Sequence, residues 1–194
     1  MKRVKLVVAY DGTNYCGWQV QPNGITIEGV LNRELSKLLK EDIAVIGASR
    51  TDSGVHSYGN VAVFDTNARM PAEKISYALN QRLPDDIVVQ NSSEIPQDWH
   101  PRHCNSRKTY EYRILNREFP MPQRRLDTWF VYRKLNISAM CEAAKQFEGT
   151  HDFKSFCSVN TAVEDTTRTI YSCKLKQDGE LLTIRITGSG FLYN

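Results

Sequence analysis

Cysteines are few in this sequence, and none lies at a spacing typical of a disulfide-rich domain or a redox motif. There are five, an odd number, scattered along the chain without a C-x-x-C pair. We therefore expect free thiols in a reducing compartment, which favours a cytoplasmic protein. The cysteines are Cys16, Cys104, Cys141, Cys157 and Cys173.

Long apolar runs are also missing. No stretch approaches the roughly 18 apolar residues that a membrane helix needs. The chain begins Met1-Lys2-Arg3 and continues in a strand pattern, without the apolar core of a signal peptide. We therefore expect no membrane association.

Metal-ligand patterns are limited to one weak candidate. His100, His103 and Cys104 form an H-x-x-H-C pattern. A tetrahedral zinc site needs a fourth ligand, and the sequence offers no second His/Cys pair at ligand spacing. We therefore expect no metal.

The positive charge is concentrated in one segment. Residues 102–134 hold 9 basic and 3 acidic side chains, whereas the parts before and after are each slightly acidic. Aromatic residues alternate with these cations, a pattern that suits a phosphate backbone with exposed bases. A solvated charged surface with its aromatics in the core would give the same pattern. The aromatic residues are Tyr110, Tyr112, Trp129, Phe130 and Tyr132.

The first half of the chain predicts a complete supersecondary unit. Apolar alternation over residues 3–10 predicts a strand, and Thr26 can cap a helix whose apolar positions recur every 3.6 residues. Strands are expected at 43–48, 60–65 and 87–89, with a second helix from Pro71. The order β-α-β-β-α-β is the ferredoxin-like, or split βαβ, arrangement: an antiparallel sheet with both helices on one face.

The pattern restarts after a linker at residues 92–101. A strand at 108–115 precedes a helix capped by Ser138 and closed by Gly149, and 168–175 with 181–187 predicts a hairpin. These are the first four elements of a second split βαβ unit. We expect an α+β protein of two tandem ferredoxin-like units with antiparallel sheets. The domains are 1–101, carrying the polar loop described next, and 102–194, which begins with the basic segment and is incomplete at its C-terminus.

A polar loop joins two expected strands in the first unit. A turn between antiparallel strands needs only two to five residues, but this loop is longer and combines a cation, a carboxylate, glycines and a histidine. Polar loops on a rigid sheet often carry catalytic groups, and Asp52 is the candidate. The alternative is that Asp52 bonds to the loop's own amides in an Asx-turn. The stretch concerned is Ala48-Ser49-Arg50-Thr51-Asp52-Ser53-Gly54-Val55-His56-Ser57-Tyr58-Gly59-Asn60-Val61.

The loop motif R-T-D-x-G-V-H, residues 50–56, resembles the signature of the tRNA pseudouridine synthase A (TruA) family. Other family motifs recur in the same order, so the resemblance covers essentially the whole chain. They are Tyr10-Asp11-Gly12, Tyr15-Cys16-Gly17-Trp18-Gln19, Asn80 with Leu83-Pro84 and Asp86-Ile87, Trp99-His100 with Arg102, Tyr110-Glu111-Tyr112, and Gly190-Phe191-Leu192-Tyr193.

The resemblance implies a function. Members isomerise uridine to pseudouridine in the anticodon arm of tRNA, at positions 38, 39 and 40, and act as homodimers that grip one tRNA. Because this reaction needs no redox change and no external energy, we expect no cofactor and no metal. The motif's aspartate, here Asp52, is the catalytic nucleophile, and Tyr110 matches the active-site tyrosine that stacks on the flipped base. The active-site cleft is expected between the two units.

Substrate-binding roles follow for several basic residues. Arg50 either supplies the cation that keeps Asp52 ionised or, as the resemblance implies, inserts into the RNA. Arg102, Arg107 and Lys108 are expected to bind phosphates flanking the target. His56 belongs to the signature and either contacts RNA or bonds to the backbone.

Two questions stay open at this level. Asp52 could attack C1′ of the ribose, attack C6 of the base, or assist elimination. The alternative to an enzyme is a non-catalytic RNA-binding module of tandem ferredoxin-like units, although the aromatic strand signature of RNA-recognition motifs is missing.

The end of the chain carries a further expectation. In the family, the motif at Gly190–Tyr193 leads into a helix whose basic residue pairs with the catalytic aspartate. The half-finished second unit agrees with a truncated chain, and a chain lacking that basic residue is expected to be impaired or inactive.

Overall fold

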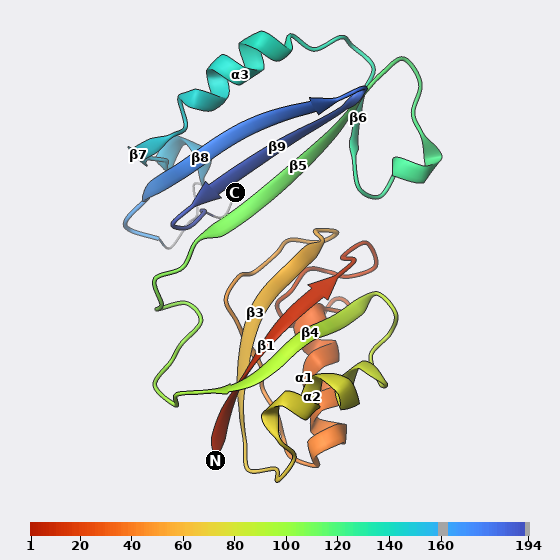
Figure 1. Cartoon of the computed structure of the whole chain (residues 1–194), viewed down its shortest axis with the longest axis vertical. Helices are drawn as coiled ribbons and strands as arrows, with labels where there is room; N and C mark the ends of the chain where they lie inside the picture. The colour runs from red at the N-terminus through yellow and green to blue at the C-terminus, as the bar shows by residue number, and fades with distance from the viewer. Residues whose placement is uncertain (159–162, 193–194) are drawn as a thin grey trace. The chain divides into compact units, whose positions relative to one another are not determined.

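The computed structural model describes residues 1–158 and 163–192 (Figure 1). The chain forms two compact units, Met1–Cys104 and Asn105–Asn194, so the boundary expected between residues 101 and 102 lies just before the end of the first unit. Within the described residues, no helix is long and apolar enough to cross a membrane.

The first unit is a four-stranded sheet with two helices on one face (Figure 1). Its strand order is β2-β3-β1-β4, and every neighbouring pair is antiparallel. This is the order of a split βαβ unit, so the predicted arrangement is confirmed. The elements are β1 (Lys2–Tyr10), α1 (Ile27–Leu39), β2 (Ile46–Gly47), β3 (Ser57–Thr66), α2 (Ala72–Asn80) and β4 (Ile87–Ile95).

Periodicity in the sequence explains these elements. Alternate residues of β1 are buried against the helices, while the residues between them are half-buried on the opposite face. Thr26 caps α1 as predicted, and its side chain accepts a hydrogen bond from the Gly29 amide. The buried side of α1 follows the 3.6-residue period through Ile27, Leu31 and Leu35.

Two of the strands expected in this unit have clearly different bounds in the structure. The strand expected at 43–48 shrinks to Ile46–Gly47. The amides of Ile43 and Val45 bond instead to Ser36 Oγ and Asn32 Oδ1 of α1, at 2.9 and 2.8 Å. Conversely, the strand expected at 87–89 runs on to Ile95, through polar residues that look like a linker.

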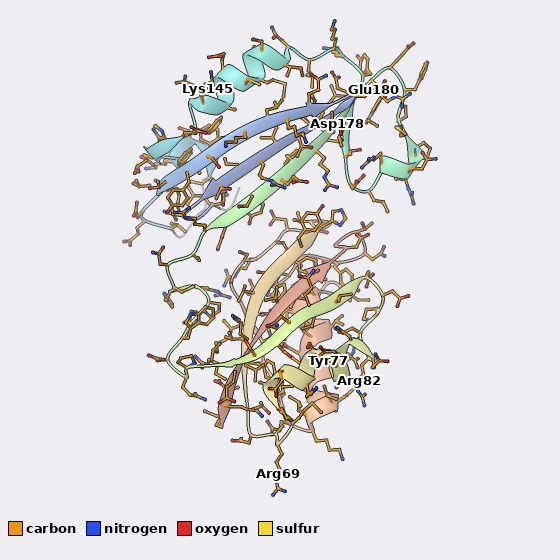
Figure 2. All side chains as sticks on the ribbon, in the orientation of Figure 1. Arg69, Tyr77, Arg82, Lys145, Asp178 and Glu180 are labelled. Carbon is orange, nitrogen blue, oxygen red and sulfur yellow. The ribbon has the colours of Figure 1, made fainter. Side chains whose placement is uncertain are left out.

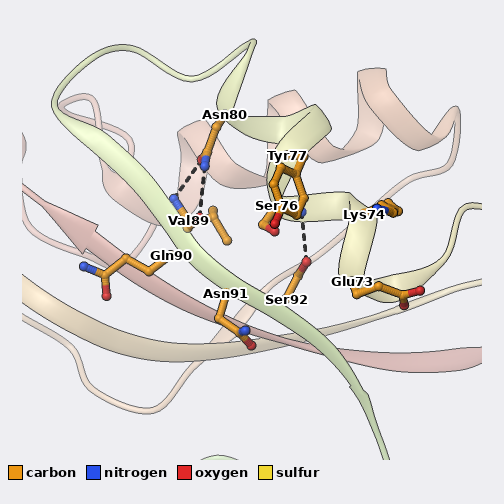
Figure 3. Close-up of a pocket in the computed structure, with 9 residues that line it drawn as sticks. All are labelled: Glu73, Lys74, Ser76, Tyr77, Asn80, Val89, Gln90, Asn91 and Ser92. Atoms are coloured by element: carbon orange, nitrogen blue, oxygen red, sulfur yellow. Dashed lines mark hydrogen bonds between the residues drawn. The ribbon is translucent and has the colours of Figure 1, made fainter.

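Polar side chains fasten α2 to β4. Asn80 at the end of α2 donates to the Val89 carbonyl and accepts from the Val89 amide, at 2.9 and 2.8 Å. The Ser92 hydroxyl accepts from the Ser76 amide at 2.9 Å (Figure 3). Asn80, one of the family motif residues, therefore has a structural part in holding the helix on the edge strand.

The second unit is a five-stranded sheet in the order β6-β5-β9-β8-β7. The expected β-α-β-β order is confirmed as β5, α3, β8 and β9, with β7 added at one edge and β6 at the other. Because β6 runs parallel to β5, this sheet is mixed rather than purely antiparallel. The elements are β5 (Lys108–Asn116), η1 (Pro122–Arg124), β6 (Trp129–Val131), α3 (Ile137–Lys145), β7 (Gly149–Asp152), η2 (Lys154–Phe156), β8 (Thr167–Asp178) and β9 (Leu181–Gly188).

The expected ends of α3 are both wrong. Asn136, rather than Ser138, caps the helix, with its side chain accepting from the Ala139 amide; asparagine is as good an N-cap as serine. The helix ends at Lys145 with Gln146 as C-cap, and Gly149, at φ +108, begins β7 instead.

Candidate active-site loop

The loop of residues 48–56 connects β2 to β3 and carries Asp52. Its entry is fixed at the sheet, where the Ala48 amide donates to the Val61 carbonyl at 2.7 Å. The residue before Asp52 is held at two points. The Trp18 amide donates to the Thr51 carbonyl at 3.0 Å, and the hydroxyls of Thr51 and Tyr10 are 2.8 Å apart. Because Trp18 and Tyr10 belong to the buried core, this side of Asp52 is rigidly attached.

The residues after Asp52 are held by one carbonyl group. The Gly54 amide and the Ser53 hydroxyl both donate to the Tyr15 carbonyl oxygen, each at 3.2 Å. Gly54 itself adopts φ +78, a conformation that glycine takes without steric cost. The loop is therefore anchored on both sides of Asp52 by the segment that follows β1.

Asp52 itself is exposed. Within residues 1–158 and 163–192, its carboxylate makes no hydrogen bond or ion pair; only its carbonyl accepts a bond, from the Val55 amide at 3.2 Å. An Asx-turn would consume that carboxylate on the loop's own amides, so that alternative is wrong for the described structure. An uncommitted carboxylate on an anchored backbone can serve as nucleophile or base.

His56 closes the loop against the turn after β1. Its Nδ1 lies 2.9 Å from Asp11 Oδ1 and 3.2 Å from the Gly12 nitrogen. It donates to Asp11 when protonated at Nδ1 and accepts from Gly12 when not. The Thr13 hydroxyl and amide, followed by His56, hold the pKa of Asp11 below its usual range. His56 therefore bonds within the protein on this side; its predicted contact with RNA stays a prediction.

Gly12 and Gly17, which belong to the family motifs near the start of the chain, pack so closely on the loop that a side chain would not fit at either position. A Cβ on Gly12 would lie 2.0 Å from the Val55 carbonyl oxygen, and one on Gly17, at φ +82, 2.5 Å from the Thr51 carbonyl oxygen. Both obstacles are backbone atoms of the loop. The glycines in the Tyr10-Asp11-Gly12 and Cys16-Gly17-Trp18 motifs thus let the loop pack directly on the first turn of the chain.

We expect Gly17→Ala to destabilise the protein by about 2–4 kcal/mol, because left-handed strain adds to a clash with the loop backbone. Gly179→Ala is the matched control: Gly179 also has positive φ, +58, but a Cβ there meets nothing within 4 Å. The control should cost only about 1 kcal/mol. Urea unfolding of both variants measures the difference, and equal costs would contradict the close packing of the loop.

The other candidates in the first unit are cations near the same loop. Arg50 is exposed two residues before Asp52. Arg102 reaches back to the sheet, where its Nε donates to the Gly47 carbonyl at 2.9 Å. Gly47 ends β2 and directly precedes the loop, so Arg102 lies close to the start of the loop. The loop itself carries the other three candidates of this unit, Arg50, Asp52 and His56.

The remaining candidates gather at the start of β5 in the second unit. Tyr110 is half-buried and packs edge-on against Phe191, with ring centroids 4.7 Å apart. The Arg107 guanidinium lies over the Tyr171 ring at 4.6 Å, and Lys108 is the first residue of β5. Of the Gly190–Tyr193 motif, Tyr193 lies outside the described residues.

A set of cations on the second sheet was missed by sequence reasoning. Cys173 and Ile186 pack on the α3 side, so their neighbours on β8 and β9 point to the opposite face. That face, here called the basic sheet face, also carries a hydroxyl pair, Thr109 and Thr187, at 2.9 Å. The alternation of cations in β8 was the signal that could have found it. Its cations are Arg113, Lys174, Lys176 and Arg185.

Not all of these cations are available to a ligand. Arg113 bonds to both Glu111 and Asp127, and Arg185 bonds to the other Glu111 oxygen at 2.8 Å. Lys174 and Lys176 are exposed. The basic sheet face is therefore a cationic surface in which the two lysines are most accessible.

Two other places in the chain, the H-x-x-H-C pattern and a cavity in the first unit, give no support for a functional site. Among the described residues, no three His, Cys, Asp or Glu side chains converge to hold a metal; His100 and His103 stack at 4.4 Å, and Cys104 Sγ is directed at the Pro101 carbonyl. A polar cavity of about 330 Å³ lies between α2 and β4, remote in sequence from the loop (Figure 3). Asn80 and Ser92 in its wall are committed to the backbone bonds described above.

A family model and the similar proteins all carry the same description, tRNA pseudouridine synthase. The family model described as tRNA pseudouridine synthase matches residues 6–103 and 143–194. A tRNA pseudouridine synthase A of Thermoanaerobacter sp. (strain X514) is 45% identical over 194 residues, which cover 100% of this chain and 80% of the relative. The protein of that name from Clostridium acetobutylicum is 47% identical over 197 residues, again covering 100% and 80%. That of Citrifermentans bemidjiense is 45% identical, covering 100% and 78%.

Proposed function

Because the chain belongs to the tRNA pseudouridine synthase family, a family of enzymes, we propose that it converts uridine to pseudouridine in the anticodon arm of tRNA with Asp52 as the nucleophile. The observation that carries this proposal is the exposed Asp52 carboxylate, anchored through Thr51 on one side and Ser53 and Gly54 on the other. The non-catalytic alternative gives such a carboxylate no role.

A carboxylate such as that of Asp52 is the main chemical group that the reaction requires. It breaks the N1–C1′ bond, turns the uracil and joins C5 to C1′, with no net change in oxidation state. A carboxylate can add covalently at one stage, as glycosidase carboxylates do at C1′. Attack at C1′, attack at C6 and assisted elimination all require the ionised form of the carboxylate.

The other residues are proposed to handle the RNA. A base within a stem must be extruded at a cost of a few kcal/mol, and stacking on an aromatic ring offsets part of that cost. Tyr110 is proposed as the ring, with Arg50, His56, Arg102, Arg107 and Lys108 contacting the RNA around the target. The homodimeric state implied by the resemblance and the cytoplasmic location expected from the unpaired cysteines are proposed with it.

The target position can be tested with substrate variants. A tRNA whose uridines at positions 38, 39 and 40 are replaced by cytidine should form no pseudouridine, whereas restoring one of them should restore one equivalent. Pseudouridine is counted by nucleoside chromatography after digestion. Modification that persists in the cytidine-substituted tRNA would contradict an anticodon-arm target.

We expect the basic sheet face to contribute to tRNA affinity through phosphate contacts. The double variant Lys174→Ala/Lys176→Ala should bind tRNA several-fold more weakly, and the slope of log Kd against log salt should fall by about 1–2. The control is Lys145→Ala on α3 (Figure 2), a lysine already paired with Glu142 at 3.0 Å. An unchanged salt slope in the double variant would exclude this face from the RNA-binding surface.

A further inference from the structure

A buried tyrosine links the candidate loop to a distant turn. Tyr15 is 6% exposed, and its hydroxyl donates to Asp86 Oδ1 at 2.5 Å. Asp86 immediately precedes β4, and its carbonyl accepts from the Asp11 amide at 2.9 Å. The turn before β4 is therefore bonded to the segment after β1 at both a side chain and the backbone.

The same tyrosine holds the loop through its main chain. Its carbonyl oxygen is the group that accepts from the Gly54 amide and the Ser53 hydroxyl, the two residues that follow Asp52. The Tyr15 amide in turn donates to the Gly12 carbonyl at 3.0 Å. Tyr15 thus connects Asp86 at its hydroxyl with the Asp52 loop at its carbonyl.

The Tyr15 hydroxyl lies in surroundings that favour its protonated form. Burial, followed by the hydrogen bond to Asp86, raises the pKa of the Tyr15 hydroxyl far above its usual value. The raised pKa keeps the hydroxyl protonated at neutral pH, so it can donate to Asp86. A hydrogen bond from a neutral donor to a carboxylate is stronger than one between neutral groups.

We propose that Tyr15 and Asp86 are positioning residues that fix the direction of the Asp52 carboxylate; the inference rests on the proposed role of Asp52. Neither residue is a catalytic residue, because Tyr15 is enclosed in the core and acts on the loop only through its backbone. Without the hydroxyl bond, the Tyr15 ring and carbonyl are free to shift, and Ser53 and Gly54 shift with them. A displacement of about 1 Å at a reacting group can cost about 100-fold in rate.

The kinetic test compares five variants with wild type. Tyr15→Phe and Asp86→Ala should each lower kcat 10- to 100-fold with KM for tRNA within twofold, and the double variant should be no worse than either. Asp86→Asn keeps an oxygen acceptor and should retain kcat within about threefold. Tyr77→Phe, on an exposed tyrosine of α2 (Figure 2), should match wild type.

Amide hydrogen exchange at Gly54 tests the same inference without turnover. The exchange rate at Gly54 should rise at least tenfold in Tyr15→Phe and in Asp86→Ala and stay unchanged in Asp86→Asn and Tyr77→Phe, while amides in β1 keep their protection. Slow exchange at Gly54 in Tyr15→Phe, additive losses in the double variant, or an Asp86→Asn variant as slow as Asp86→Ala would overturn the proposal. If the full-length wild-type protein shows no turnover, the proposed function fails, and the exchange rates alone decide whether the pair positions the loop.

Discussion

Asp52→Asn is expected to lower the rate of pseudouridine formation at least about a thousandfold while leaving tRNA affinity within twofold of wild type. An amide of the same shape keeps the loop geometry but is a far poorer nucleophile than a carboxylate, and loss of a nucleophile costs several orders of magnitude in kcat. The exposed carboxylate has no partner among the described residues, so its removal should cost little stability. Single-turnover assays and filter binding measure the two quantities.

The matched control for this substitution is Asp42→Asn, a change of the same kind at another exposed aspartate. It should leave both rate and affinity unaltered. An Asp52→Asn protein that binds tRNA poorly would mean that Asp52 contributes to the RNA surface rather than to chemistry.

Tyr110→Phe is expected to lower kcat by about 100-fold with little change in tRNA affinity, since stacking survives while the hydroxyl that would exchange a proton at C5 is lost. Tyr110→Ala should also weaken tRNA binding, by about 1–3 kcal/mol, because the stacking surface is removed. Single-turnover rates and dissociation constants separate the two effects.

Tyr112→Phe provides the comparison on the same strand. Tyr112 lies two residues further along β5, on the same face, and is 63% exposed. Its hydroxyl should be dispensable. If Tyr112→Phe loses as much rate as Tyr110→Phe, the assignment of the active-site tyrosine to Tyr110 is wrong.

The fold was predictable wherever local patterns determine the outcome. The alternation in β1, the period of α1 and the Thr26 cap each depend on residues close in sequence, so the first unit could be read directly. The ends of β2 and α3 could not. They depend on side chains that compete for the same backbone group, such as Asn32 at the Val45 amide, or on two equally good caps, such as Asn136 and Ser138.

The sequence indicated candidate residues for the site but not the contacts that hold them. Residue types in the loop pointed to Asp52, and the family resemblance to Tyr110. Contacts between residues far apart in the sequence cannot be recognised from local patterns. Nothing in the sequence indicates that Tyr15 joins Gly54 to Asp86, or that Gly17 packs on Thr51. The basic sheet face was missed because its cations lie on different strands, and only the register brings Lys174 and Arg185 side by side.

The central claim is tested most directly with tRNA that carries tritium at C5 of its uridines. Joining C5 to C1′ expels the hydrogen at C5, so pseudouridine formation releases tritium to water. We expect release by the full-length wild-type protein, reaching one equivalent per modified uridine, and none above background by its Asp52→Asn variant under conditions where both are bound to tRNA. Equal release by the two proteins would contradict the account.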